Sequence, residues 1–369
     1  MDQLLQSPLA FAHEQLGAKM AEFSGWAMPI EYAGGGVLTE HAAVREAVGV
    51  FDVSHLGKLR LTGPGAVAHL QSRLTNDFDK VGPGQALYNL LANAQGGVID
   101  DLIAYVIADD DVLLVPNAAN ATTVAEVLAQ NMPDGLKLAN QHRDLAIIAV
   151  QGPRCDDLIS RVGLPTDLDY MSFAVIAGER VGLPTTLCRT GYTGERGVEL
   201  ICPVSEAMDW WNRLMEAGDR LGVRACGLGA RDTLRTEMGY PLHGHEFSPI
   251  IDGITGGAAW AVSKTKTGYD GAEAFARIRA DGGPLRRLRG IKALGRGIPR
   301  PGMEVVDAEG AVIGKVSSGT FSPTLRTGIG LAHIDVDHGL GKQVGVRVRN
   351  RVENFEIVKP PFVEPHVRD

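Results

Sequence analysis

Two adjacent carboxylates, Asp100 and Asp101, lie in the stretch GGVIDDLIAY (residues 96–105), which otherwise has the composition of a buried strand. Apolar residues flank the pair on both sides, so an unpaired charge there would be costly. Neighbouring side chains of a strand point to opposite faces, and the two acids therefore cannot enter one pocket together. We predict that one faces a ligand and that the other faces water or a structural partner, such as the GG turn just before it.

Two arginines and one glutamate could bind a polar ligand. Arg231 and Arg235 in CGLGARDTLRTE (226–237) share one face of a helix, where they repel by roughly a few tenths of a kcal/mol unless an anion lies beside them. Glu199 in RTGYTGERGVEL (189–200) points to one side of a strand and could accept both N–H donors of a 2-aminopyrimidinone ring. Each stretch also has a purely structural explanation: a tight strand connection, and a helix whose own acids pair with arginines.

The elements that must position these side chains are strands and helices without a regular alternation. Residues 86–116 predict an antiparallel meander, and FDVSHLGKLRLTG (51–63) alternates like one strand. A helix over 230–239 carries both arginines. This mixture favours an α+β fold with antiparallel sheets over a doubly wound nucleotide fold, and the sequence contains no glycine-rich phosphate-binding motif.

The pattern of the sequence changes near residues 281–284 (DGGP). From about 286 to 363, short strands alternate with Gly and Pro turns, which predicts a separate small β-barrel or sandwich. We therefore expect a core formed by residues 1–280 and a C-terminal β-barrel domain formed by residues 284–369.

Composition disfavours several classes of function. The net charge of −8 over 369 residues, with 22% charged residues, disfavours general binding to nucleic acid or to an anionic membrane. The apolar stretches are too short to span a bilayer, and the first residues lack the features of a secretory signal. The four cysteines form no CxxC pair, and the cluster His243, His245 and Glu246 lacks the spacing of a helical metal site. We expect a cytoplasmic protein that needs no metal.

Six stretches of the chain resemble a single family. They are FDVSHLGKL (51–59), LTNDF (74–78), GGVIDDLIAY (96–105), RTGYTGERGVEL (189–200), CGLGARDTLRTE (226–237) and VSSGTFSPTL (316–325). Together they closely resemble the aminomethyltransferases, the T-proteins of the glycine cleavage system, from about residue 8 to about residue 363. The combination of RTGYTGE with GLGARD is the most specific part of this resemblance.

The resemblance implies a three-lobed α+β protein. Two lobes are interleaved antiparallel sheets with helices, one of them at roughly residues 52–140, and the third is the C-terminal β-barrel. Tetrahydrofolate would occupy the central opening as co-substrate, and the lipoyl-carrying H-protein would be the partner. The implied reaction moves the one-carbon unit of the S-aminomethyldihydrolipoyl arm to tetrahydrofolate, giving 5,10-methylenetetrahydrofolate, ammonia and dihydrolipoyl-H-protein.

Matched motif to motif, the resemblance assigns three principal roles: Asp101 is the catalytic aspartate, Glu199 binds the pterin, and Arg231 binds folate. Positions that line the folate site fall on Tyr88, Asn117, Tyr192 and Tyr240. Asp101 would then share a strand face with Ile99 and Ile103, and Asp100 would lie on the other. A carboxylate near N5 and N10 of folate can orient the reduced pterin and take up a proton, chemistry that requires no metal and no covalent nucleophile.

The sequence departs from the family pattern at three places. Leu56 stands where many members have methionine, a conservative change. The segment SPIIDGITGGAAWAVS (248–263), which leads to Trp260, is unusually rich in glycine. The C-terminal PFVEPHVRD lacks a tyrosine that some relatives place against folate, so we expect no ligand contact after residue 240.

Two other functions remain open. One is a folate-dependent demethylase of a small sulfonium or N-methyl compound. The other is a folate-binding protein without turnover that maintains iron–sulfur enzymes, although its relatives carry a cysteine in a KGCYxGQ-like motif where this chain has RTGYTGE. The basic stretch 277–300 is either a solvated surface or a docking site for an acidic carrier.

Overall fold

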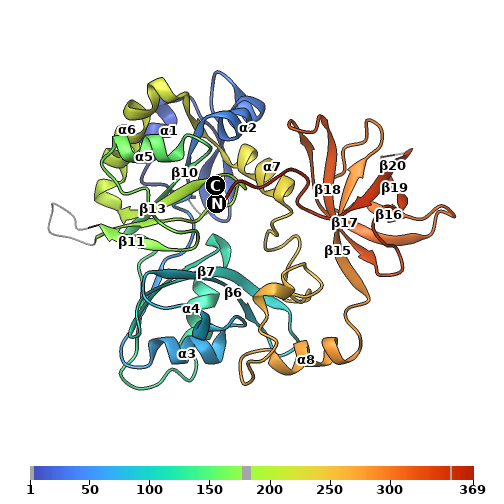
Figure 1. Ribbon diagram of the computed structural model, residues 1–369, viewed down its shortest axis with the longest axis horizontal. Helices are drawn as coiled ribbons and strands as arrows, with labels where there is room; N and C mark the ends of the chain where they lie inside the picture. Colours follow the sequence, from blue (N-terminus) through green and yellow to red (C-terminus); the bar gives the residue numbers. More distant parts are fainter. Residues whose placement is uncertain (1–3, 177–183, 350) are drawn as a thin grey trace.

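Three lobes surround the centre of the computed structural model, which describes residues 4–176, 184–349 and 351–369 (Figure 1). The first lobe combines the N-terminal segment with residues that follow the second lobe. The chain leaves the first lobe after β4 (Val48–Asp52) and returns to it at β10 (Leu145–Gln151). The α+β class and the C-terminal barrel are as predicted.

A six-stranded sheet in the order β11-β12-β13-β10-β4-β14 forms the first lobe, and its pairs are antiparallel except that of β14 with β4. Besides β4 and β10, its strands are β11 (Phe173–Ile176), β12 (Thr185–Cys188), β13 (Gly197–Pro203) and β14 (Val223–Cys226). A small sheet joins it, made of β1 (Leu5–Gln6), β2 (Lys19–Phe23) and β3 (Trp26–Glu31). All seven residues of β13 are buried, so this strand runs through the middle of the lobe.

The helices of the first lobe follow the apolar period of 3.6 residues. They are α1 (Ala10–Gln15), α2 (Gly36–Glu46), α5 (Cys155–Arg161), α6 (Ala207–Gly218) and α7 (Leu228–Met238). In α6 the buried residues Ala207, Trp210, Trp211 and Leu214 recur at helical spacing and face the core. Helix α7, which carries the two arginines, ends at Gly239 in the left-handed conformation that favours glycine.

The second lobe is a five-stranded antiparallel sheet in the order β6-β7-β8-β5-β9. Its strands are β5 (Leu59–Thr62), β6 (Gln85–Ala92), β7 (Val98–Ala108), β8 (Asp111–Pro116) and β9 (Lys137–Asn140). Its helices are α3 (Ala66–Arg73) and α4 (Ala121–Ala129). The predicted meander is therefore confirmed, whereas the single strand predicted over 51–63 is wrong. The chain turns between β4 and β5, which belong to different sheets.

Residues that follow α7 pack against the second lobe and include α8 (Ala272–Ala280). Two of the glycines in 248–263 are required by close approach: a Cβ on Gly253 would lie 2.3 Å from Leu90, and one on Gly256 would lie 2.2 Å from Phe247. The glycine content of this segment thus has a packing reason. The short 3-10 helices are η1 (Phe78–Lys80), η2 (Ala118–Asn120), η3 (Val204–Glu206), η4 (Asp219–Leu221) and η5 (Ala259–Ala261).

The third lobe is a closed barrel in the order β15-β18-β17-β16-β19-β20. Its strands are β15 (Arg286–Ala293), β16 (Glu304–Val306), β17 (Val312–Ser322), β18 (Thr327–Asp335), β19 (Gln343–Val348) and β20 (Arg351–Val358). Closure pairs every strand edge, and buried apolar side chains fill the interior. The barrel begins at Arg286, and the domain division at 280–284 stays a prediction.

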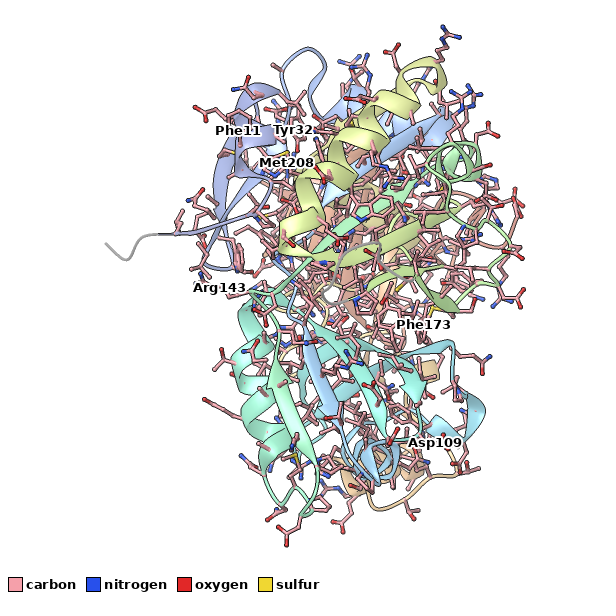
Figure 2. All side chains as sticks on the ribbon, turned by 90° about the vertical axis from the view of Figure 1, so that its left-hand side faces the viewer. Phe11, Tyr32, Asp109, Arg143, Phe173 and Met208 are labelled. Carbon is pink, nitrogen blue, oxygen red and sulfur yellow. The ribbon has the colours of Figure 1, made fainter. Side chains whose placement is uncertain are left out.

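The first two lobes share a continuous apolar core. Phe173 of the first lobe makes an edge contact with Tyr105 of the second at 5.5 Å between ring centroids. Figure 2 labels Phe173 at the level where the two lobes meet. The two sheets are therefore held at a defined separation, which positions side chains from both of them around the centre.

Candidate active site

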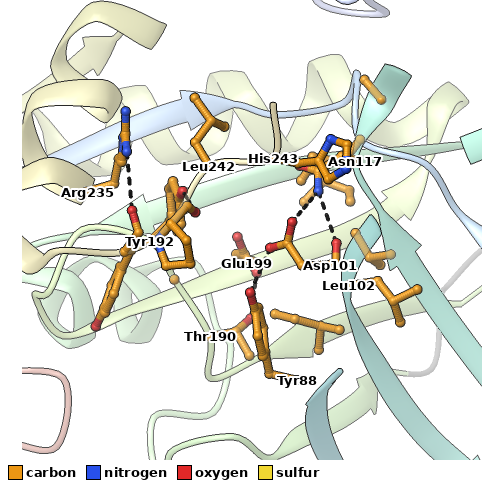
Figure 3. Close-up of a pocket in the computed structure, with 18 of the residues that line it drawn as sticks. Tyr88, Asp101, Leu102, Asn117, Thr190, Tyr192, Glu199, Arg235, Leu242 and His243 are labelled. Carbon is orange, nitrogen blue, oxygen red and sulfur yellow. Dashed lines mark hydrogen bonds between the residues drawn. The ribbon is translucent and has the colours of Figure 1, made fainter. Parts of the chain in front are cut away.

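A cavity of about 990 Å³ lies between the lobes. The residues that line it include all seven that the resemblance assigned to the site: Tyr88, Asp101, Asn117, Tyr192, Glu199, Arg231 and Tyr240. They come from β6, β7, the end of β8, β13, α7 and the loops beside them. Figure 3 shows several of them around one space.

Asp101 projects from β7 into the cavity, with two partners at its carboxylate. The hydroxyl of Tyr88, on the neighbouring strand β6, donates to Asp101 Oδ2 at 2.8 Å, and Asn117 Nδ2 donates to Oδ1 at 2.9 Å (Figure 3). Burial raises the pKa of Asp101 above its usual value. A carboxyl group with a raised pKa that borders a cavity is suited to accept a proton from a ligand.

Asp100 lies on the other face of β7, as the strand alternation predicts, and of the two surroundings that we expected it has structural partners and not water. Its side chain is 0% exposed and therefore does not face water. It does not cap the GG turn either, because Asn93 Oδ1 accepts the backbone N–H of Gly97 at 3.0 Å. Asp100 instead accepts hydrogen bonds from Asn117 and Asn120, and its pKa is raised to about 8 by burial and by the charge of Asp101.

Glu199 also lines the cavity and is held by a chain of hydroxyl groups. Thr190 Oγ1 donates to Glu199 Oε2 at 2.6 Å, and the same hydroxyl contacts the Tyr105 hydroxyl at 3.1 Å. The side chain lies on β13 opposite Cys188 of β12. A carboxylate has about four acceptor sites, so Glu199 retains capacity for two N–H donors of a ligand.

The two arginines of α7 differ in a way that the sequence did not predict. Arg235 donates to Asp232 at 2.6 Å and to Glu246 at 3.2 Å, so protein carboxylates neutralise it. For Arg235 the structural alternative holds, because an acid of its own helix, Asp232, pairs with it. Among the described residues, no partner contacts the buried Nη1 of Arg231, whose guanidinium lies 4.7 Å from the ring centre of Tyr192.

Burial lowers the pKa of Arg231 from its usual value, which expresses the cost of keeping this charge away from water. An arginine cannot deprotonate at ordinary pH, so the charge remains. Arg231 is therefore the cation of this helix that a bound anion would stabilise.

Aromatic rings form two further parts of the wall. Tyr192 stacks on Tyr240 with 5.7 Å between ring centroids, and its hydroxyl donates to the carbonyl of Pro241. Tyr88 stacks on Trp260 at 5.0 Å. Because Trp260 is 65% exposed and borders the cavity, its indole forms part of the rim.

The sequence analysis missed several lining residues. We expected no contact after residue 240, yet Leu242, His243, Trp260 and Arg368 border the cavity. His55 also lines it, with its Nδ1 buried and without a partner in the described part of the chain. Burial lowers the pKa of His55 to about 3, helped by the nearby charge of Arg231, so its ring is neutral at pH 7. The signal available for Trp260 was its place in the segment AAWAVS (258–263), which resembles a tryptophan-containing segment of the family.

The histidine cluster is tied to the protein itself. His243 Nε2 donates to the carbonyl of Val98 at 3.0 Å, and His245 Nδ1 lies 2.9 Å from the carbonyl of Ser317. Within residues 4–176, 184–349 and 351–369, no group of three or more His, Cys, Asp or Glu is arranged to hold a metal ion. These histidines position the cavity wall.

The fold and the site together define a class: a three-lobed α+β protein with a C-terminal barrel, whose central cavity combines aromatic walls, an unpaired arginine and two separated carboxylates. Comparison with known proteins identifies the family. Residues 9–266 match the GCVT N-terminal domain, and residues 286–364 match the glycine cleavage T-protein C-terminal barrel domain.

Similar proteins match over the full length. An aminomethyltransferase of Parafrankia sp. is 52% identical over 368 residues, with 100% of each chain covered, and one of Mycobacterium tuberculosis is 49% identical, with 99% of each covered. The crystal structure of the glycine cleavage system aminomethyltransferase T from Bartonella henselae superposes with a TM-score of 0.92 at 33% identity, and each chain is covered completely. The chain belongs to the aminomethyltransferase family, the T-proteins of the glycine cleavage system. Over the described residues, no helix is long and apolar enough to cross a membrane.

Proposed function

We propose that the protein transfers the one-carbon unit of the S-aminomethyldihydrolipoyl arm of H-protein to tetrahydrofolate. The products would be 5,10-methylenetetrahydrofolate, ammonia and dihydrolipoyl-H-protein. The observation that carries the proposal is the meeting of Asp101, Glu199 and the unpaired Arg231 in one cavity of a chain from this family. We expect this activity in the cytoplasm.

The cavity offers a complementary group for each part of a reduced folate. Glu199 can accept the paired N–H donors of the pterin ring, and the rings of Tyr88 and Trp260 supply an aromatic surface at the rim. Arg231 can neutralise a carboxylate of the ligand, which removes the cost of its unpaired charge. In this pose Asp101 would face N5 and N10 of the reduced folate.

The transfer forms carbon bonds to N5 and N10 of folate and breaks the bonds from the same carbon to the amino nitrogen and to the lipoyl sulfur. The hydrogens of N5 and N10 end on ammonia and on the thiol. Asp101 can take up the proton that N5 loses as it bonds to carbon, and Tyr88 and Asn117 hold the carboxylate for this step. No residue of the chain forms a covalent bond to the carbon.

The direct test is ammonia release when the purified protein is mixed with tetrahydrofolate and aminomethylated H-protein. Release that requires both would support the proposal, and no release would contradict it. Folate-dependent demethylation of a small sulfonium or N-methyl compound without H-protein would instead indicate the demethylase.

The basic stretch 277–300 is our proposed contact for the acidic carrier. Arg286 is held by Asp335 at 2.6 Å, and Arg279 donates to backbone carbonyls, so the exposed Arg287 is the better probe. Arg287→Glu should weaken the apparent carrier affinity several-fold, and the difference from wild type should shrink as salt rises. Arg220→Glu, an equal charge change at an exposed site on the first lobe, is the control. Equal affinities for all three proteins would contradict this contact.

A further inference from the structure

Asp100 does not line the cavity, yet its carboxylate accepts several hydrogen bonds from residues that do. Three N–H donors converge on it: the backbone N–H of Asn117 at 2.9 Å, Asn117 Nδ2 at 2.9 Å and Asn120 Nδ2 at 2.7 Å. Burying a second acid beside Asp101 is costly, because two nearby carboxylates repel. The turn before it does not need Asp100, since Asn93 caps that turn. The burial of Asp100 beside Asp101 therefore needs another explanation.

Each of the two asparagines also holds a residue that lines the cavity. Asn117 Nδ2 donates to Asp101 Oδ1 at 2.9 Å and to the Asp101 carbonyl at 3.0 Å (Figure 3). Asn120 Nδ2 lies 3.0 Å from His243 Nδ1. Because the carbonyl of Val98 can only accept, His243 Nε2 carries the hydrogen and Nδ1 accepts from Asn120. Asp100 is thus connected to Asp101 through Asn117 and to His243 through Asn120.

The charged and titratable groups around Asp101 come from several elements. Tyr88 lies on β6, Asp100 on β7, His243 after α7, and Tyr192 in the loop before β13. Only Tyr88 contacts the Asp101 carboxylate directly among these four. The orientation of Asp101 Oδ1 therefore depends on Asn117, which Asp100 holds by two hydrogen bonds.

We infer that Asp100 is a positioning residue, which holds Asp101 through Asn117 and His243 through Asn120 in the arrangement that the transfer requires. The inference rests on the proposed function. It predicts that Asp100 affects turnover more than the affinity for folate, because Asp100 itself does not line the cavity and acts on it only through the two asparagines.

Asp100→Asn tests the inference with little change in shape. The amide nitrogen of the introduced asparagine would face a donor in either orientation, either the backbone N–H of Asn117 at the Oδ2 position or both asparagine amides at the Oδ1 position. The hold on Asn117 would therefore loosen in both cases. We expect kcat to fall about 10- to 100-fold, the effect typical of removing a group that orients a reacting residue, while the dissociation constant for tetrahydrofolate stays within about twofold. Asp110→Asn, at the exposed turn of the same hairpin, is the matched control. A kcat within about twofold of wild type would overturn the inference.

Asn120→Ala is a second variant, which leaves the contacts between Asp100, Asn117 and Asp101 in place. It should lower kcat by less than Asp100→Asn does, about 3- to 10-fold. If both act through the same centre, the double variant should be no slower than Asp100→Asn alone. If the kcat losses of the two single variants multiply in the double variant, the two residues act independently and the inference is overturned. If Asp100→Asn fails to fold, Asn120→Ala alone tests the inference.

A readout without turnover separates this inference from the proposed function. The ring nitrogens of His243 should show one tautomer by NMR in the wild type and an exchanging ring in Asp100→Asn and Asn120→Ala. Absence of ammonia release by the wild type would contradict the proposed function alone. An unchanged His243 signal in both variants would overturn the role of Asp100.

Discussion

Two buried polar clusters of this protein contain the same kinds of groups and differ in whether their hydrogen bonds are complete. In the first lobe, a closed cluster consists of Ser7, His13, Tyr32 and Asp52. His13 Nε2 donates to Asp52 Oδ2 at 2.8 Å, the Ser7 hydroxyl donates to the same oxygen, and the Tyr32 hydroxyl lies 2.9 Å from His13 Nδ1. The central cavity instead contains buried polar atoms without partners among the described residues, on Arg231 and His55.

The pKa of a buried aspartate shifts in opposite directions in the two clusters. Burial alone would raise the pKa of Asp52, but hydrogen bonds and the charge of His13 lower it below its usual value. Burial raises the pKa of Asp101, and its partners do not reverse the shift. A closed cluster stabilises the folded chain, whereas an incomplete one costs stability that a ligand can return. This difference separates a structural cluster from a binding site more sharply than residue type does.

The largest expected effect comes from removing the proton acceptor of the cavity. Asp101→Asn keeps the shape and the contact to Tyr88 but cannot take up a proton, so turnover should fall about 10²- to 10⁴-fold. Folate binding, measured by calorimetry, should remain. Full turnover in this variant would show that Asp101 is not the catalytic carboxylate.

Breaking the closed cluster should change stability and leave the chemistry alone. Asp52→Ala strands His13 in the core, and we expect a loss of about 3–5 kcal/mol in the free energy of unfolding. Denaturant titration measures the loss, and kcat should be normal at temperatures where the variant is folded. Ser7→Ala, which removes one neutral donor, should cost only about 1 kcal/mol. Equal losses would mean that the charge pair does not dominate the cluster.

The two arginines of α7, one helical turn apart, provide the same contrast between a buried group with protein partners and one without. Arg231→Met should weaken folate binding by about 2 kcal/mol, or roughly 30-fold, while stability is unchanged or higher because an unpaired buried charge is gone. Arg235→Met strands Glu246 and should lower the free energy of unfolding by about 3 kcal/mol. Calorimetry measures the folate affinity of both variants, and denaturant titration measures their free energy of unfolding. A stability loss in Arg231→Met as large as that in Arg235→Met would contradict the distinction between a binding arginine and a structural one.

The pH dependence of stability also distinguishes Asp100 from Asp52. The folded pKa of Asp100 is raised to about 8 from 3.8, so its contribution is present below about pH 4 and is lost as pH rises through 8. Asp52 has a lowered folded pKa, so its contribution is present above its unfolded pKa and is lost in acid. Between pH 4 and 8, wild type should therefore lose more stability than Asp100→Asn. Parallel curves for the two proteins would contradict the raised pKa.

Much of the architecture follows from local pattern. The alternation of β7 places Asp101 on the cavity face and Asp100 on the other, because side-chain direction in a strand depends only on position. The stretch 51–63 shows the limit of such reasoning. Its alternating pattern continues through β4 and β5, and nothing local reveals that the two strands belong to different sheets.

The sequence by itself determined the α+β class and the C-terminal barrel, since period and turn residues are local properties, and the family resemblance of its motifs named seven of the side chains that meet at the cavity. Only the tertiary structure decided which of those side chains are already satisfied. Arg235 finds Glu246 and Ser318 from distant segments, and Asp100 finds two asparagines beyond the next strand. Nη1 of Arg231 finds no hydrogen-bond partner among the described residues. Hydrogen-bond partners depend on how remote segments pack, and packing is a property of the whole chain.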